Sequence, residues 1–283
     1  MGITGLLPLL KESIDQTHIS KFKGQRLAVD TYCWMHRAVY GHTEEMSSGK
    51  DSTRWIQYCM GILDMLLSFE IEVYLVFDGK NLPAKEKTEI DRAASRSKNL
   101  ELGHAEKRKG NTAEARSLLA RSVDVSPRMA AQFIQVLKKH RPQVKYIVAP
   151  YEADAQLAYL CTHNLVDGVI SEDSDCVPYG CKSILFKLDK QSGRCSHLAL
   201  HSLKTHTVKG FDLQHFDPEM MITMCVAAGC DYAPSPKNFG LKSSYRLVAK
   251  LKKPSRLLRY VVWYDSDMLD GAMYSWWMKA FFV

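Results

Sequence analysis

The sequence has 283 residues, of which 46% are hydrophobic, and its formal net charge is +7. This length and apolar content suffice for a buried core without covalent staples, in one large domain or two small ones. No apolar run approaches the ~20 residues that span a bilayer, which excludes a membrane-spanning helix and predicts no membrane partner. The positive charge favours a polyanionic partner without identifying one.

The eight cysteines form no CxxC pair and have no spacing typical of a zinc site. No signal peptide precedes them. This usage predicts reduced, mostly buried thiols in an intracellular protein.

Short apolar segments alternate with helical patterns along the first two thirds of the chain. The segments typical of buried strands are 26–30, 72–78, 145–150 and 167–173. The helical patterns are 53–69, 126–140 and 152–164. This alternation predicts an α/β fold with a central, mostly parallel sheet flanked by helices. Further on, "SILFKL" and "CSHLAL" predict a strand pair around the turn "DKQSGR".

Residues 79–132 differ from their surroundings because they contain no Phe, Tyr or Trp. The segment is rich in cations, among them Lys85 and Arg92, so we expect an exposed helical excursion that contributes little to the core. It follows directly on the strand that ends at Asp78. An excursion from that point can bring cations over an acidic site.

Acidic residues follow the ends of all four predicted strands. They are Asp30, Asp78, Glu152, Asp154, Asp173 and Asp175. Ligands of open parallel sheets bind in the crevice beyond the carboxyl ends of the strands, so these acids are expected in one crevice. Taken alone, the acids of "APYEADAQLAYL" would also fit an ordinary helix start. Glu172 is expected to face solvent.

Carboxylates gathered in one crevice repel each other, and divalent cations relieve that repulsion. Oxygen ligands without His or Cys at ligand spacing favour Mg²⁺ or Mn²⁺ over zinc. Two such ions, roughly 4 Å apart, would activate a water and stabilise the leaving oxygen of a phosphodiester. The pattern therefore predicts phosphodiester hydrolysis rather than glycoside hydrolysis, which uses two carboxylates.

Six motifs resemble those of the flap endonuclease (XPG/Rad2-like) superfamily of structure-specific 5′ nucleases, most closely its exonuclease 1 branch. They are "MGITGLLPLLK", "AVDTYCWMHRA", "VFDGKNLPAK", "VAPYEADAQLAYL", "EDSDCVPYGC" and "GCDY". The resemblance runs from residue 1 to about 250. It implies a PIN-like 5′ nuclease core with a helical arch and a C-terminal helix-two-turn-helix. The implied regions are an N-terminal nuclease region (1–99), an arch or connecting helical segment (100–137), an internal nuclease region (138–231), and a DNA-binding segment with a divergent end (232–283).

The resemblance also implies roles for individual residues. The metal-site acids are Asp30, Asp78, Glu152, Asp154, Asp173, Asp175 and Asp231, and they would hold two Mg²⁺ ions, with Mn²⁺ as a substitute. Lys85 and Arg92 stand where relatives place catalytic arch cations that contact the scissile phosphate, beside the catalytic Asp78 and Asp173. Gly2 would lie close to the active site, and His36 near the DNA junction.

The helix-two-turn-helix is expected at about 233–252, where Lys242, Arg246 and Lys250 would hold DNA phosphates. A potassium ion often sits in this hairpin in relatives, but Asn238 replaces the usual first glycine of the turn, which puts K⁺ binding in doubt. Cys176 stands where relatives usually have an aliphatic residue, and it is expected to fill that core position. Beyond about 255 the resemblance stops.

The implied function is a Mg²⁺-dependent 5′→3′ exonuclease on double-stranded DNA, with 5′-flap cleavage as a further activity, in nuclear DNA repair, mismatch repair and recombination. The expected partners are DNA with 5′ ends, nicks, gaps or flaps, and mismatch-repair proteins. A sliding clamp is a further candidate, because "SWWMKAFF" (275–282) resembles a clamp-binding peptide. The alternatives are a truncated DNA-binding paralogue with weak or no nuclease activity and a junction resolvase of the same superfamily.

Overall fold

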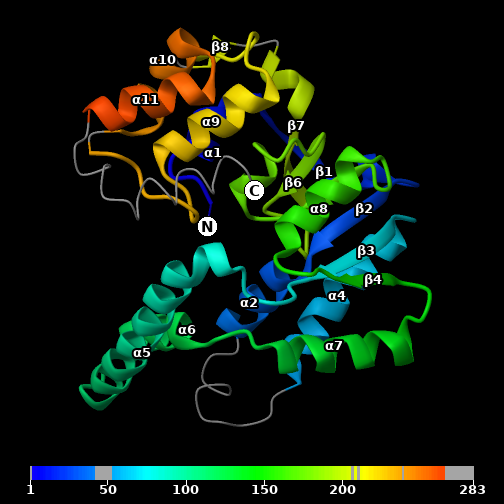
Figure 1. Cartoon of the computed structure of the whole chain (residues 1–283). Helices are drawn as coiled ribbons and strands as arrows, with labels where there is room; N and C mark the ends of the chain where they lie inside the picture. Colours follow the sequence, from blue (N-terminus) through cyan, green and yellow to red (C-terminus); the bar gives the residue numbers. More distant parts are fainter. Residues whose placement is uncertain (1, 42–52, 205–206, 209–210, 238, 265–283) are drawn as a thin grey trace.

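The computed structural model describes residues 2–41, 53–204, 207–208, 211–237 and 239–264 (Figure 1). The strands are β1 (Ile14–His18), β2 (Arg26–Asp30), β3 (Glu72–Phe77), β4 (Lys145–Val148), β5 (Gly168–Ile170), β6 (Ser183–Phe186), β7 (Arg194–Ala199), β8 (Thr207–Val208) and β9 (Phe211–Asp212). The α-helices are α1 (Leu6–Leu9), α2 (Thr31–Gly41), α4 (Arg54–Ser68), α5 (Glu86–Arg108), α6 (Thr112–Ser122), α7 (Pro127–His140), α8 (Ala153–Thr162), α9 (Pro218–Ala228), α10 (Leu241–Leu251) and α11 (Pro254–Tyr264). Short 3-10 helices are η1 (Leu10–Ser13), η2 (Ile19–Phe22), η3 (Pro83–Lys85), η4 (Ser174–Cys176) and η5 (Leu200–Lys204).

Seven strands form the central sheet in the order β1-β7-β6-β5-β2-β3-β4. The strands from β6 to β4 are parallel, and β7 and β1 add an antiparallel edge. The predicted α/β class, the four strands and the later hairpin are confirmed. Strand β1 escaped prediction because its sequence, "IDQTH", is mostly polar and pairs only at the sheet edge.

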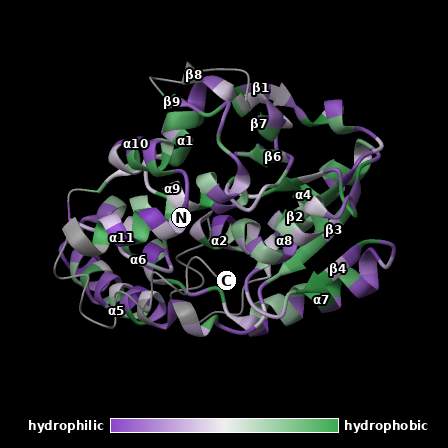
Figure 2. Ribbon diagram, turned by 45° about the horizontal axis from the view of Figure 1, so that its top comes forward, coloured by the Kyte–Doolittle hydropathy of each residue, from purple (hydrophilic) through white to green (hydrophobic). Residues whose placement is uncertain are grey.

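Each face of the sheet carries its own core, because side chains alternate along the strands. In β2, Leu27 and Val29 pack with α2, α4 and α7, whereas Ala28 packs on the other face with α1, α8 and α9. Figure 2 shows β3 and β4 as largely hydrophobic ribbons. The carboxyl ends of β2, β3 and β5 are therefore rigidly placed at one edge.

Helices α5 and α6 form a hairpin that extends away from the sheet (Figure 1). Its helices approach closely at Gly103, where a Cβ would lie 2.8 Å from the Leu119 Cγ. The expected charged excursion is thus a pair of helices spanning 86–122. Residues 127–132 were expected to belong to the exposed excursion. They instead form the start of α7, and Met129 and Ala130 are buried in the core.

Two helices, α9 and α10, are joined by the loop 229–240 and pack against each other. The helix-two-turn-helix was expected at about 233–252. This range contains α10 and part of the loop, but α9 lies before it. Asn238 lies outside the described residues, as does the peptide 275–282.

All eight cysteines are free thiols, and all but Cys230 are buried, in agreement with their expected state. Cys176 is completely buried in the core, as its position predicted. Among the described residues, no helix combines the length and apolar character that a bilayer crossing requires.

We expect Leu137→Ala in α7 to lower the free energy of unfolding by about 2–5 kcal/mol, because Leu137 is 1% exposed and its loss leaves a cavity. The matched control is Leu165→Ala, whose side chain is 45% exposed and whose effect should stay within about 0.5 kcal/mol. Urea unfolding of both variants measures the difference. Equal effects would show that α7 does not belong to the core.

Candidate active site

The first two acids lie at the ends of neighbouring parallel strands. Asp30 is the last residue of β2, is 8% exposed, and accepts hydrogen bonds from the Cys33 backbone N–H at 3.2 Å and the Cys33 thiol at 2.7 Å. Asp78 follows β3, and its Oδ1 accepts a hydrogen bond from the Ala153 backbone N–H at 2.7 Å. Asp78 thus ties the end of β3 to the first turn of α8.

Glu152 and Asp154 lie at the junction between β4 and α8, as predicted. Glu152 is the N-cap residue with extended backbone, and Asp154 is in the first helical turn. Their carboxylates serve different neighbours. Glu152 faces Lys85 and Tyr232, whereas Asp154 experiences the charges of Asp30, Asp173 and Asp175.

Asp173 and Asp175 are held by the 3-10 turn η4. The Asp175 backbone N–H donates to Asp173 Oδ1 at 2.9 Å, which makes Asp173 the N-cap of that turn. The Asp173 backbone N–H donates to Ser171 Oγ at 3.0 Å, and Ser171 Oγ donates to Asp30 Oδ2 at 3.4 Å. Ser171 therefore links the acids of β2 and β5, a role that no spacing in the sequence revealed.

The N-terminal segment closes over this turn. Gly2 has a φ of 80°, and a Cβ on it would lie 2.2 Å from Asp173 Oδ1. The next residue, Ile3, donates its backbone N–H to Ser174 Oγ at 2.8 Å. Gly2 thus lies beside the acids as expected, and only glycine allows the approach.

Burial and mutual repulsion raise the pKa of several of these carboxyls. Burial and then Asp173 raise the pKa of Asp175 to about 7, and burial raises the pKa of Asp78 to about 6, with Asp30 and Glu152 adding to it. The pKa values of Asp30 and Asp154 are also raised, mainly by burial. One oxygen each of Asp154 and Asp175 is buried without a hydrogen-bond partner. Orphaned, mutually repelling carboxylate oxygens fit a hard divalent cation.

Lys85 and Arg92 come from the foot of the α5–α6 hairpin and contact the other half of the acids. Lys85 is 4% exposed, with its Nζ 2.9 Å from Glu152 Oε1 and 3.5 Å from Asp231 Oδ2. Arg92 lies 2.7 Å from Asp231 Oδ2. Burial opposes the charge of Lys85, but the Glu152 carboxylate outweighs it and raises the pKa of the amine.

The seven acids thus share one region. Lys85 and Arg92 neutralise Glu152 and Asp231, and Asp78 is bonded to the start of α8. The other four, Asp30, Asp154, Asp173 and Asp175, lie within reach of one another's charge. Within the part of the chain that the structure describes, no three His, Cys, Asp or Glu side chains are arranged to hold one ion.

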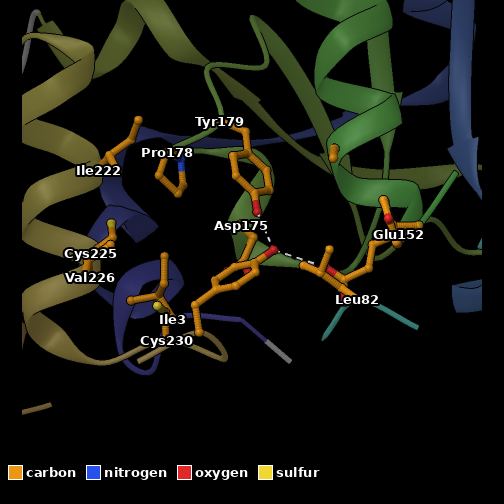
Figure 3. Close-up of a pocket in the computed structure, with 13 residues that line it drawn as sticks. Ile3, Leu82, Glu152, Asp175, Pro178, Tyr179, Ile222, Cys225, Val226 and Cys230 are labelled. Atoms are coloured by element: carbon orange, nitrogen blue, oxygen red, sulfur yellow. Dashed lines mark hydrogen bonds between the residues drawn. The ribbon is translucent and has the colours of Figure 1, made fainter. Parts of the chain in front are cut away.

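Two phenols join the group with the cations and were missed by sequence reasoning. Tyr232 donates its hydroxyl hydrogen to Glu152 Oε2 at 3.0 Å, and the Tyr179 and Tyr232 oxygens are 2.7 Å apart (Figure 3). Lys85 Nζ lies 4.5 Å from the centroid of the Tyr232 ring. Tyr232 follows Asp231 directly, but nothing in the sequence pattern pairs it with Glu152.

Glu172 is more exposed than Asp173 and Asp175, as expected, because its side chain keeps 32% of its surface open. It also forms an ion pair with Arg37 of α2 and accepts a hydrogen bond from the Lys187 backbone N–H at 2.9 Å. The sequence did not reveal these partners, because α2 lies far away along the chain. Glu172 ties α2 to the end of β6.

Of the residues expected to contact DNA, Lys85 is buried, whereas His36 and the three cations of α10 are exposed. Lys242, Arg246 and Lys250 recur every four residues along α10, so they lie on one face, opposite the buried Ser244 and Val248. His36 is exposed on α2, where the charges of the α5–α6 region act on it.

The chain is similar to known proteins along nearly its whole length. Residues 1–99 match the XPG N-terminal domain, and residues 143–231 match the XPG I-region. Exonuclease 1 of Oryza sativa subsp. japonica is 40% identical over 261 residues, which cover 92% of this chain and 31% of that protein. The chain therefore spans about a third of the length of this relative.

Solved structures share the fold. The catalytic core of Rad2 in complex with DNA substrate superposes with a TM-score of 0.68 at 21% identity, over 96% of this chain and 74% of that one. The Holliday junction-resolving enzyme GEN1, in complex with product DNA and a Mg²⁺ ion, gives a TM-score of 0.58 at 20% identity, over 88% and 51% of the two chains. The seven-stranded sheet with its flanking helices is therefore an architecture common to these proteins.

The acid cluster predicts opposite effects of pH on the metal-free and the Mg²⁺-loaded protein. Folded Asp78 and Asp175 keep their protons up to about pH 6 and 7, whereas unfolded aspartates lose them near pH 4. Stability without metal should therefore fall as the pH rises from about 4 to 7. Mg²⁺ needs ionised carboxylates, so the increase in melting temperature on adding Mg²⁺ should be larger at about pH 8 than at about pH 5.5.

Thermal unfolding with EDTA or saturating Mg²⁺ measures this difference, and each kcal/mol corresponds to about 2–4 °C in a chain of this size. Asp175→Asn should lose most of the Mg²⁺ effect at both pH values, whereas Glu12→Gln, an exposed acid in η1, should keep it. An equal Mg²⁺ effect at the two pH values in the unsubstituted protein would contradict the prediction.

Proposed function

Because the chain belongs to the XPG/Rad2 family of 5′ nucleases, we propose that it is a Mg²⁺-dependent 5′→3′ exonuclease on double-stranded DNA, with 5′-flap cleavage as a second activity of the same site. The observation that carries the proposal is the gathering of seven carboxylates with Lys85 and Arg92 at the carboxyl edge of the sheet. Its similarity to Exonuclease 1 over most of the chain favours exonuclease action over junction resolution.

We assign the seven acids to hold two Mg²⁺ ions, which Mn²⁺ can replace. The orphaned oxygens of Asp154 and Asp175 and the oxygen-only donor set support this assignment. Bound divalent cations neutralise the carboxylates and polarise the phosphodiester and a water molecule. That the related fold of GEN1 was solved with a Mg²⁺ ion agrees with this choice of metal.

Lys85 and Arg92 would stabilise the negative charge that develops on the scissile phosphate. Both already lie at the acidic edge, and Lys85 is almost fully buried, where a charge acts more strongly than in water. A phosphate that enters would share these cations with Glu152 and Asp231. The backbone at Gly2 lies directly against Asp173 and Asp175, because no side chain separates them.

The duplex would be held behind the acids by the basic face of α10, formed by Lys242, Arg246 and Lys250, with His36 near the junction. Such phosphate contacts position DNA without reading its sequence. The catalytic core of Rad2, which shares this fold, was solved in complex with a DNA substrate, and this supports DNA as the ligand. We also propose a K⁺ ion in the α9–α10 hairpin. The structure does not test this site, because Asn238 lies outside the described residues.

The proposed regions are 1–99, 100–137, 138–231 and 232–283, with α5 crossing from the first into the second. The same proposal places the protein in the nucleus and in DNA repair. Its proposed protein partners are mismatch-repair proteins and a sliding clamp. Calorimetry with a peptide of residues 272–283 tests the clamp contact.

Asp173→Asn should reduce cleavage of an end-labelled duplex with a recessed 5′ end at least ~100-fold in Mg²⁺, because it removes a charge from the acid cluster while keeping its shape. Binding in Ca²⁺ should persist. Glu12→Gln is the matched control and should cleave as the unsubstituted protein does. Binding without cleavage by the unsubstituted chain in Mg²⁺ would overturn the nuclease proposal and favour a DNA-binding paralogue. Product lengths distinguish exonuclease from flap cleavage.

Replacing Lys242, Arg246 and Lys250 together by Ala should weaken duplex binding uniformly across sequences. Each lost phosphate contact should lower the slope of log affinity against log salt by about 1. The matched control replaces Arg128, Lys138 and Lys139, which are exposed on α7 at the far side of the sheet. Salt titrations of binding in Ca²⁺ measure both slopes. A larger loss in the α7 variant would place the duplex elsewhere.

A further inference from the structure

A cavity of about 230 Å³ adjoins the acid cluster and shares Glu152 and Asp175 with it (Figure 3). Its other walls come from the foot of the α5–α6 hairpin at Leu82, the N-terminal segment at Ile3, and α9 at Ile222. The cavity is smaller than the ~300–1,000 Å³ typical of sites for drug-sized ligands. It therefore suits a single compact group beside the reacting phosphate.

The polar groups of the lining are two carboxylates, two thiols and the phenol hydroxyls of Tyr151, Tyr179 and Tyr232. Two of the hydroxyls are engaged, because Tyr179 and Tyr232 bond to each other at 2.7 Å and Tyr232 donates to Glu152 at 3.0 Å, whereas Tyr151 is 45% exposed. What remains for a ligand is mainly aliphatic and aromatic surface. The carboxylates would repel a phosphate, so the cavity suits an uncharged group.

Lys85 lies between the acid cluster and the cavity. Its Nζ lies 2.9 Å from Glu152 Oε1 and 4.5 Å from the centroid of the Tyr232 ring, which lines the cavity. A phosphodiester that contacts Lys85 therefore has the cavity as its direct neighbour. A nucleotide carries both groups in this order, with a charged phosphate joined through a sugar to an uncharged planar base.

We propose that this cavity binds the nucleobase of the 5′-terminal nucleotide that the enzyme removes. The inference rests on the proposed nuclease function and deepens it. Insertion of the base offsets the cost of unstacking it from the duplex and draws the adjoining phosphate towards the acids and Lys85. Because ring faces and aliphatic groups make up most of the lining, all four bases should be accepted with similar rates.

The test compares single-turnover cleavage of two duplexes with a recessed 5′ end, one natural and one with an abasic tetrahydrofuran in place of the terminal nucleoside. Without the base, cleavage by the unsubstituted chain should slow at least about fivefold, the lower end of what base–aromatic stacking contributes. Ile222→Phe, which fills the cavity, should slow the natural substrate by a similar factor and leave the abasic substrate at its already reduced rate. Leu165→Phe, an exposed position outside the cavity, should leave both rates as they are.

A second measurement needs no substitution. Cys230 lines the cavity and is the one thiol of the eight that is not buried. In Ca²⁺, saturating natural substrate should slow its modification by methyl methanethiosulfonate, followed by mass spectrometry, at least about fivefold relative to the abasic substrate.

Equal cleavage rates on the two substrates, or equal protection of Cys230, overturn the inference while leaving the nuclease function intact. Failure to cleave either substrate in Mg²⁺ overturns the proposed function and this inference with it.

Discussion

Seven carboxylates share one edge of the sheet, and they repel one another. Hydrogen-bond donors and cations from several neighbouring segments reduce this repulsion. Cys33, Ser171 and the start of α8 donate hydrogen bonds to Asp30 and Asp78. Lys85 and Arg92 neutralise Glu152 and Asp231. The repulsion that remains helps to raise the pKa of Asp175. One oxygen each of Asp154 and Asp175 is left without a hydrogen-bond partner. Protons on these carboxyls relieve the repulsion, and a bound divalent cation would relieve it as well.

This balance couples parts of the fold that are distant in sequence. The α5–α6 hairpin provides the cations, whereas the loop after α9 provides Asp231 and Tyr232. Thr88 of the hairpin also donates to the Asp231 backbone carbonyl at 3.1 Å, so the two segments meet at that residue. Glu152 and Asp231 therefore connect the acids to the foot of the hairpin.

Polar and apolar surfaces meet sharply at Glu152. On one side lie acids and cations suited to a phosphate, and on the other lies the cavity lined by Tyr179, Tyr232 and α9. A nucleotide has the same division between phosphate and base. The proposed recognition by such a surface would depend on the general form of a nucleotide rather than on its sequence.

The sequence by itself determined the parallel core and the acids at its edge, because apolar runs predict buried strands, and residues after parallel strands meet at one edge. It also determined that Lys85 and Arg92 leave the sheet just beyond Asp78. Only the tertiary structure decided the partners of each side chain. Ser171 bonds to Asp30 from 141 residues away, Tyr232 bonds to Glu152, and Glu172 pairs with Arg37. Periodicity encodes local backbone and burial, whereas these contacts depend on where distant segments pack, and the polar edge strand β1 is specified by its pairing with β7 alone.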